Sequence, residues 1–347
     1  MFIMKITRVL ELDALRGIAA LMVVFYHYTV DRPQADLGFF LGTTGVELFF
    51  MISGFVILMS LNSVKSSLHF IVNRISRLYP TYWACVTFTF IALTIYYHVD
   101  LGYNEIERYL GNLTMFQFYF NISDIDDSYW TMIIEMTFYI GMLVLYHLKK
   151  LNYLNWIGFI IIIGVSISGL FFHDSPIVKE VFNSIQIVLY LPLFISGTIF
   201  YNLYFNKEKI WQRYSLLALC LIAQILSYNY TDRFRFSVNQ TQYSIMLIVY
   251  YALFSLIVNH KLGFIVSKGT LFLGKISFAV YLIHQAFSIK ILLPFFMEDL
   301  NFNFWISSLV FSIPIVIIIA ALITYFIEIP FGRLLKQNLF AKKLANH

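Results

Sequence analysis

Long runs of apolar residues alternate with short polar segments along the whole chain. A run of about 20 apolar residues forms a helix that crosses the hydrocarbon core of a bilayer. The pattern therefore predicts ten transmembrane helices and little else. The predicted spans lie near residues 10–30, 40–61, 80–98, 129–148, 154–172, 184–204, 214–230, 241–259, 270–292 and 304–328.

Composition excludes an ordinary soluble domain. Of the 347 residues, 60% are hydrophobic and 12% are charged, and the mean hydropathy is +0.75. We expect an all-α polytopic membrane protein with a single transmembrane domain over 8–335 and a short basic cytoplasmic tail at 336–347. Cys85 and Cys220 lie inside apolar runs, which is typical of packed, reduced thiols and indicates neither a disulfide framework nor a zinc site.

The distribution of positive charge predicts the orientation. With the N-terminus in the cytoplasm, 16 of the 24 Lys and Arg residues fall on inside segments and six on outside segments, while Arg16 and Lys275 lie within spans. Cytoplasmic loops carry an excess of Lys and Arg, so this division places both termini in the cytoplasm. The six outside residues are Arg32, Arg108, Lys179, Arg233, Arg235 and Lys290.

The first span carries charge inside an apolar helix. Arg16 and His27 are 11 residues apart, which places them on one helical face and roughly 16 Å apart along the axis. An Arg inside such a span costs a few kcal/mol and indicates a functional site. The alternative is a snorkelling Arg with a His packed among its neighbours. Asp13 is a further polar group near the start of the same helix.

Two motifs follow the first span. Glu47 lies in an apolar run together with Gly42, Gly45 and Gly54, glycines that permit close helix approach or a break in the helix. This carboxylate either pairs with Arg16 or acts at the site directly, because a buried charge needs a partner.

Arg74 and Arg77 then lie at i and i+3 on a predicted interfacial helix over 64–80, where two guanidinium groups suit phosphate oxygens. Lipid anchoring is the alternative role of this pair. Pro80 is expected to open the third span, at a first turn that needs no N–H.

Three later spans hold isolated polar groups. Glu135 lies in the fourth span, with Tyr139 one turn further on and able to hydrogen-bond it. In the ninth span Tyr281 and His284 share one face. Glu328 closes the tenth span, where a contact with Arg333 would be structural.

A His and a carboxylate in a low-dielectric cavity suit general-base work on a hydroxyl, and inner cations suit a polyphosphate donor. The residues alone also allow a proton-coupled transporter.

Six segments resemble, in order, the motifs of the membrane acyltransferase-3 family, which includes bacterial O-antigen and other polysaccharide O-acetyltransferases. The resemblance covers about residues 8–335. The segments are LDALRGIAALMVVFYH (12–27), GVELFFMISGF (45–55), RISRLYPTYW (74–83), YWTMIIEMTFY (129–139), SFAVYLIHQ (277–285) and IEIP (327–330).

The resemblance implies roles for these residues. His27 is expected to be catalytic, with Glu135 and His284 as its partners, while Arg16, Arg74 and Arg77 bind the donor. Asp13, Glu47, Tyr281 and Glu328 are expected to be polar groups for substrate or structure. Glu47 stands where the family has Asp, and the family's Trp-Ser-Leu-x-x-Glu motif is kept here only as Trp130 and Glu135.

The implied donor is acetyl-CoA, with no metal or prosthetic group. The expected acceptor is a sugar hydroxyl of a surface polysaccharide, O-antigen or lipid-linked glycan. Besides this glycan we expect contact with membrane lipids but not with nucleic acid, in a multi-pass protein of the bacterial plasma (inner) membrane. The family's longer members carry an extracytoplasmic hydrolase-like domain, which we do not expect in this chain. The alternatives are a glycan transporter or exporter without acyl transfer, and a structural subunit of an assembly complex.

Overall fold

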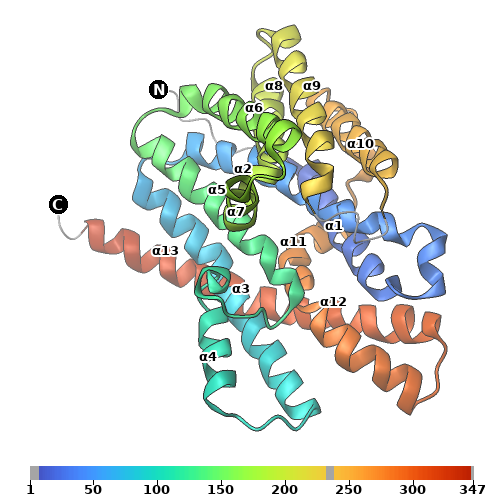
Figure 1. Cartoon of the computed structure of the whole chain (residues 1–347). Coiled ribbons are helices and arrows are strands. Elements are labelled where there is room, and N and C mark those ends of the chain that lie inside the picture. Colours follow the sequence, from blue (N-terminus) through green and yellow to red (C-terminus); the bar gives the residue numbers. More distant parts are fainter. Residues whose placement is uncertain (1–7, 232–237, 345–347) are drawn as a thin grey trace. The chain divides into compact units, whose positions relative to one another are not determined.

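The computed structural model of the chain describes residues 8–231 and 238–344, and the secondary structure within these residues is entirely helical. The predicted all-α fold class is therefore confirmed (Figure 1). The α-helices are α1 (Leu10–Thr29), α2 (Gly45–Ser63), α3 (Ser67–Tyr96), α4 (Tyr103–Asn112), α5 (Trp130–His147), α6 (Leu154–Phe172), α7 (Pro176–Ser184), α8 (Ile187–Phe205), α9 (Ile210–Leu226), α10 (Gln240–Val258), α11 (Lys268–Ile283), α12 (Ile313–Ile323) and α13 (Ile329–Leu344).

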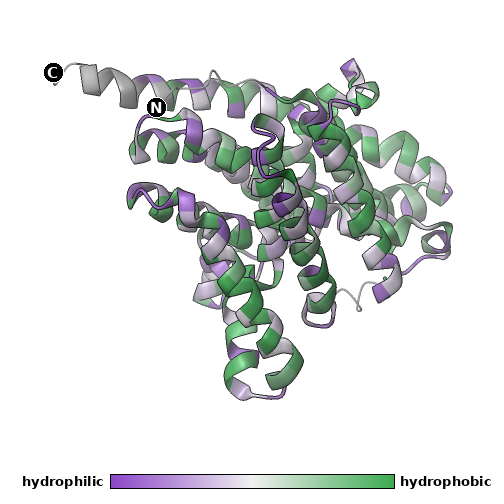
Figure 2. Cartoon of the chain, turned by 90° about the horizontal axis from the view of Figure 1, so that it is seen from above, coloured by the Kyte–Doolittle hydropathy of each residue, from purple (hydrophilic) through white to green (hydrophobic). Residues whose placement is uncertain are grey.

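The helices confirm a polytopic membrane protein. Among the described residues, eight helices are long and apolar enough to cross a membrane, and a bent pair raises that number to nine. Each of these corresponds to one predicted span. The remaining predicted span, 10–30, is helical as α1, but α1 is not among these apolar helices, and it carries Glu11, Asp13 and Arg16. Figure 2 shows hydrophobic residues along most of the helices, with hydrophilic residues gathered in the turns.

The chain forms two compact units. The first consists of the described residues up to Ser67 together with Ile134–Leu271, and the second of Leu68–Ile133 together with the described residues from Phe272 onward. α1, α2, α6, α7, α8, α9 and α10 lie wholly in the first unit. α4, α12 and α13 lie wholly in the second. Each unit has its own core, and the two are described separately below.

In the first unit α2 packs against α8 through a crossing of small residues. A Cβ atom at Gly54 would lie 2.1 Å from the carbonyl oxygen of Phe194, and one at Gly197 would lie 2.1 Å from that of Met51. Neither position can carry a side chain when the helices are this close. Small residues at the contact are typical of helix packing in membranes, where the hydrophobic effect does not drive helices together. The predicted role of Gly54 in close helix contact is confirmed. Phe194 also stacks on Phe50, with ring centroids 4.9 Å apart.

In the second unit α3 corrects the prediction at Pro80. The sequence suggested an interfacial helix over 64–80 that ends where a new span opens, but α3 runs unbroken from Ser67 to Tyr96 with Pro80 inside it. Proline clashes with the carbonyl of residue i−4, here Ser76, and cannot donate to it. Gly332 of α13 lies against that carbonyl, since a Cβ atom there would be 2.9 Å from the Ser76 oxygen. Membrane helices tolerate proline where a neighbouring helix covers the freed group.

The ninth predicted span is also not one straight helix. α11 ends at Ile283, and after a short break the chain continues as a π-helical stretch over Ser288–Asp299 that is bent by 65° from it. Pro294 lies within this stretch and contributes to its irregular winding. Of the predicted tail 336–347, the residues up to Leu344 continue α13, and 345–347 lie outside the described residues.

Candidate functional site

α1 places Arg16 and His27 on one uninterrupted helix in the first unit. Both side chains are half-buried, and α1 covers the predicted span within a residue at each end. Arg16 forms an ion pair with Asp13, with Nη1 and Oδ1 3.8 Å apart, and Asp13 also accepts a hydrogen bond from Arg8. Asp13 therefore lies between two guanidinium groups, which offsets the cost of a charge in this helix. Asp13 was expected to serve substrate or structure, and these contacts favour the structural role.

The start of α2 and the preceding 3-10 helix, Phe39–Thr44, pack closely on α1. A Cβ atom at Gly42 would lie 2.1 Å from the carbonyl oxygen of Met22, and one at Gly45 would lie 2.9 Å from that of Ala19. These contacts lie between Arg16 and His27 along α1. Glu47, in the first turn of α2, is fully buried. A helix N-terminus favours a negative charge, which lowers the cost of burying this carboxylate there.

Glu135 of α5 is held by two hydroxyl groups of the first unit. Ser53 Oγ of α2 donates a hydrogen bond to Glu135 Oε1 at 2.7 Å, and the Tyr139 hydroxyl donates to the same oxygen. The second contact confirms the predicted hydrogen bond from Tyr139. Glu135 itself is half-buried. A carboxylate held by hydroxyl groups is oriented without being neutralised by a cation, so it can still accept a proton or orient a base.

In the second unit the two arginines of α3 have different surroundings. The Arg74 guanidinium lies 5.7 Å from the ring centroid of Phe70, one turn earlier. Arg77 lies close enough to Glu328 to attract its carboxylate. Lys275 also attracts this carboxylate, but more weakly. The sequence suggested Arg333 as the contact of Glu328, but these two cations come from other helices. Arg77 therefore already shares an acid before any ligand binds.

His284 follows the last residue of α11 and is fully buried. Its Nδ1 lies 2.7 Å from the Tyr281 carbonyl oxygen. A carbonyl can only accept, so Nδ1 carries the proton, and Nε2 is the acceptor of the neutral ring. The two rings lie side by side as predicted, with centroids 5.6 Å apart. Thr131 donates to the Tyr281 hydroxyl at 3.1 Å, which fixes the tyrosine.

The sequence did not single out Asp126 as a candidate site residue. Asp126 is fully buried in the second unit. Its Oδ1 accepts from the Ser128 amide at 2.9 Å, and its Oδ2 accepts from the Ala286 amide at 2.7 Å. Burial raises the pKa of this carboxyl to about 6. Asp126 thus ties the loop before α5 to the break that carries His284. The signal was the Asp-x-Ser cap of Asp126–Ser128, but its distant partner could not be found from the sequence.

The predicted residues fall into two sets. Within the first unit the structure joins Arg16 to Asp13, and Glu135 to Ser53 and Tyr139. Within the second it joins Tyr281 to His284 and lets Arg77 interact electrostatically with Glu328. His27 and Glu47 belong to the first unit, and Arg74 to the second. Across the part of the chain that the structure describes, no cluster of three His, Cys, Asp or Glu side chains could hold a metal ion.

Comparison with known proteins matches the chain to one family. The model for an acyltransferase domain, acyltransferase-3, matches residues 9–325. A protein of Acidianus two-tailed virus named "Putative acetyltransferase ORF330" is 28% identical over 280 residues, which cover 78% of this chain and 80% of the relative. No solved structure matches the chain at a significant level.

Proposed function

The chain belongs to the acyltransferase-3 family of multi-pass membrane enzymes, and on that premise we propose the substrates of its acyl transfer. The donor is cytoplasmic acetyl-CoA. The acceptor is a sugar hydroxyl of a surface polysaccharide, an O-antigen or a lipid-linked glycan, and the enzyme works in the bacterial plasma (inner) membrane. The family's bacterial polysaccharide O-acetyltransferases, whose motifs the chain shares, support this assignment.

The observation that carries the proposal is the geometry of α1. Arg16 and His27 lie on one continuous helix, half-buried and 11 residues apart. That spacing corresponds to roughly 16 Å, about half the hydrocarbon thickness. With the N-terminus in the cytoplasm, Arg16 is on the side from which an anionic donor arrives. His27 is deeper, where a lipid-linked acceptor is within reach.

His27 acts as the general base of the transfer. It removes the proton from the acceptor hydroxyl as the oxygen attacks the thioester carbonyl carbon. The carbon–oxygen bond forms, the carbon–sulfur bond breaks, and the proton returns from the imidazole to the leaving thiolate. No oxidant, reductant or metal is required by this sequence of bonds. An imidazole suits both proton steps because its ordinary pKa lies near neutrality.

Glu135 orients the base or its proton. The carboxylate is set by Ser53 and Tyr139, whose hydroxyls both donate to Oε1. This leaves Oε2 as the natural acceptor for an imidazolium or a substrate hydroxyl. A positioned carboxylate of this kind fixes the tautomer of a catalytic histidine and stabilises its charged form. His284 and Glu47 are proposed as further polar groups of the reaction.

Arg74 and Arg77 bind the phosphates of the donor. Their i, i+3 spacing presents two guanidinium groups on one side of α3. Arg77 must then exchange part of its interaction with Glu328 for the incoming phosphate. Release of that acid couples donor binding to the inner end of the tenth span, where the terminal Ile-Glu-Ile-Pro segment lies.

The test is transfer of a labelled acetyl group. Purified full-length protein in lipid bilayers is incubated with acetyl-CoA labelled in the acetyl group and with extracted glycan acceptors. We expect label in the glycan with wild-type protein and none with His27→Ala. His173→Ala is the matched control, because His173 is exposed and forms an ion pair with its neighbour Asp174, away from the residues proposed to react. Full transfer by His27→Ala would contradict the proposal, and glycan translocation without any need for the donor would favour a transporter.

A further inference from the structure

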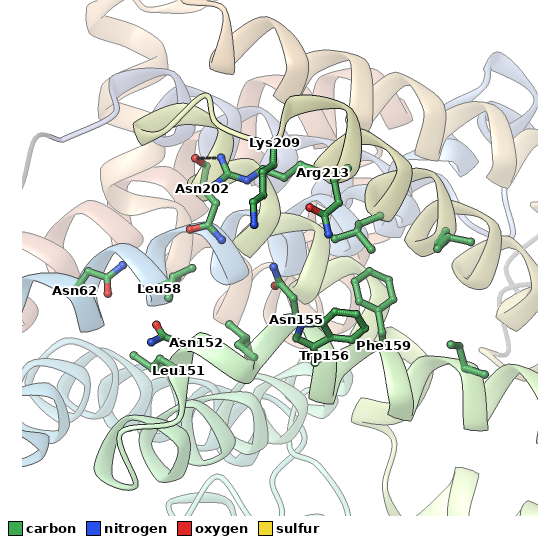
Figure 3. A pocket seen from close by; sticks show the side chains of 15 residues that line it. Leu58, Asn62, Leu151, Asn152, Asn155, Trp156, Phe159, Asn202, Lys209 and Arg213 are labelled. Atoms are coloured by element: carbon green, nitrogen blue, oxygen red, sulfur yellow. Dashed lines mark hydrogen bonds between the residues drawn. The ribbon is translucent and has the colours of Figure 1, made fainter.

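A cavity of about 510 Å³ lies in the first unit among α2, α6, α8 and α9 (Figure 3). It is placed where α2 and α8 end and where α6 and α9 begin. These helix ends border the segments that hold Lys65, Lys149 and Lys207, which the charge distribution assigns to the cytoplasm. None of the residues assigned to acyl transfer lines it.

The polar part of the cavity is basic. Four asparagines, a glutamine, a lysine and an arginine line it, and the lining drawn from the described residues includes no acid. Arg213 is fixed in place, because its Nη1 donates to the carbonyl oxygens of Asn202, at 2.8 Å, and Asn206. Lys209 immediately precedes α9, so its ammonium adds to the positive end of that helix. In Figure 3 the side chains of Lys209 and Asn155 point toward each other across the cavity.

One lining group lacks a partner. The side-chain oxygen of Asn155 in α6 is buried and accepts no hydrogen bond within the described residues. An amide enclosed without a partner costs about 1–3 kcal/mol. A ligand that brings a hydroxyl donor to this point would remove that cost. The site is therefore suited to a ligand that places an anion at Lys209 and Arg213 and a hydroxyl group at Asn155.

The rest of the lining is apolar and leads outward along α6 and α9. Trp156 is 67% exposed, Ile163 54% and Leu219 53%. In a membrane protein such surfaces face lipid, and tryptophan is enriched at the headgroup level. A free phosphate or sugar phosphate gains nothing from this apolar exit, whereas a lipid has acyl chains to place there. The occupant is therefore held at both ends, by its headgroup in the cavity and by its chains between the helices.

We propose that this cavity binds an anionic phospholipid with a hydroxyl-bearing headgroup, of the phosphatidylglycerol class, from the cytoplasmic leaflet. Its phosphodiester lies between Lys209 and Arg213. Its glycerol hydroxyls reach Asn155, and one acyl chain runs past Trp156. The proposal concerns a lipid site separate from the residues of acyl transfer, so it stands or falls independently of the proposed reaction.

The test is lipid titration followed by native mass spectrometry of the purified full-length protein. Wild-type protein is expected to bind phosphatidylglycerol in preference to phosphatidylcholine. Lys209→Gln should weaken phosphatidylglycerol binding about fivefold, because one Lys contributes about 1 kcal/mol at an anionic lipid surface. Lys207→Gln is the matched control, since it removes the same charge from the same loop but does not line the cavity. That variant should bind like the wild type.

A second variant tests the headgroup. Asn155→Leu removes the buried amide at similar volume. We expect it to lose the preference for phosphatidylglycerol over phosphatidic acid, which has the phosphate but no glycerol hydroxyls. Wild-type protein should show that preference.

Three results would overturn the proposal. The first is an equal loss in Lys207→Gln and Lys209→Gln, which would indicate general surface charge. The second is no preference of wild-type protein for phosphatidylglycerol over phosphatidic acid. The third is displacement of the lipid by soluble glycerol 3-phosphate at similar concentration, which would show a site for a free phosphate.

Discussion

The two units hold their polar groups in different ways. Among the candidate acyl-transfer residues of the first unit the contacts run from side chain to side chain: Asp13 with Arg16, and Ser53 with Glu135. In the second unit the buried His284 and Asp126 bond to the backbone, at the Tyr281 carbonyl and at the Ser128 and Ala286 amides, although side-chain pairs such as Thr131 with Tyr281 occur there too. Side-chain partners can exchange protons and reorient on a fast time scale, whereas backbone partners fix a geometry. We infer that His27 and Glu135 of the first unit take part in the proton transfers, whereas the backbone contacts of Asp126 and His284 hold the geometry of the second unit around the break after α11.

The two histidines give the largest expected difference. His27→Ala should lower the transfer rate by about 10²- to 10⁴-fold, the contribution typical of a general base, while the unfolding midpoint stays nearly constant. His284→Asn keeps an amide N–H in place of Nδ1 for the Tyr281 carbonyl and removes Nε2. We expect a smaller loss of rate in that variant. The comparison requires single-turnover rates and thermal unfolding of both proteins.

An equal loss of rate in the two histidine variants would break the distinction between the units, because the buried imidazole of His284 would then take part in the chemistry directly.

Glu135 should give the next largest effect. Glu135→Gln keeps an oxygen that Ser53 and Tyr139 can reach but removes the charge. We expect about tenfold slower transfer, because a hydrogen bond to a charged group contributes about 1.5–3 kcal/mol. Ser53→Ala should slow transfer less, since Tyr139 still orients the carboxylate. If Glu135→Gln instead lowers stability and leaves the rate unchanged, the group is structural.

The paired arginines should affect donor binding. Arg74→Ala combined with Arg77→Ala is expected to raise KM for acetyl-CoA about tenfold with a smaller change in kcat, because phosphate contacts are lost. Glu328→Gln should shift KM in the opposite direction by removing the acid that competes for Arg77. Lys65→Ala, an exposed inner cation, is the control. An unchanged KM in the double variant would favour lipid anchoring.

Asp126 should have the smallest effect on activity and a clear effect on the pH dependence of stability. Its pKa is raised by burial to about 6, above the ordinary value of about 3.9 in the unfolded chain. The folded chain therefore binds this proton more tightly. The stabilisation from this group is complete below about pH 4 and is lost as the pH rises through about 6.

Asp126→Asn should be less stable overall, because its NH2 group replaces one of the two oxygens that accept from Ser128 and Ala286 and can only donate, and it should lack this pH dependence. Unfolding midpoints of both proteins measured between pH 4 and 7 test the point. Parallel curves would contradict the raised pKa.

The sequence predicted most of the fold because hydrophobic length is a strong signal in a membrane chain. α1 was placed within a residue, since polar residues mark its two ends. α3 was divided wrongly at Pro80, because the sequence shows the missing N–H but not the neighbour that covers the freed carbonyl. No residue near Ile283 predicts the break in the helix there. The break becomes understandable only from the contact between the Ala286 amide and the distant Asp126.

The candidate site was predicted only in its ionisable side chains. Arg16, His27 and Glu135 stand out because a charge inside an apolar run is unusual. The ties of Asp126 and Ser53 depend on chain segments that are more than 80 residues away. The cavity at Lys209 was missed for another reason. Its amides and cations come from several helix ends, and no single segment of the sequence contains a motif for it.

The contact of Gly332 with the Ser76 carbonyl has a mechanical consequence. Ser76 lies between Arg74 and Arg77, and its carbonyl lacks the helical hydrogen bond that Pro80 cannot donate. This gap in the hydrogen bonding of α3 therefore falls within the segment proposed to bind the donor. A helix bends most easily where a backbone hydrogen bond is missing. Here that position contacts Gly332 in the first turns of α13. We therefore expect a change in the winding of α3 at the arginines to displace α13. A spectroscopic probe on an exposed residue of α13, such as Leu334, would report occupancy of the arginines from outside the site.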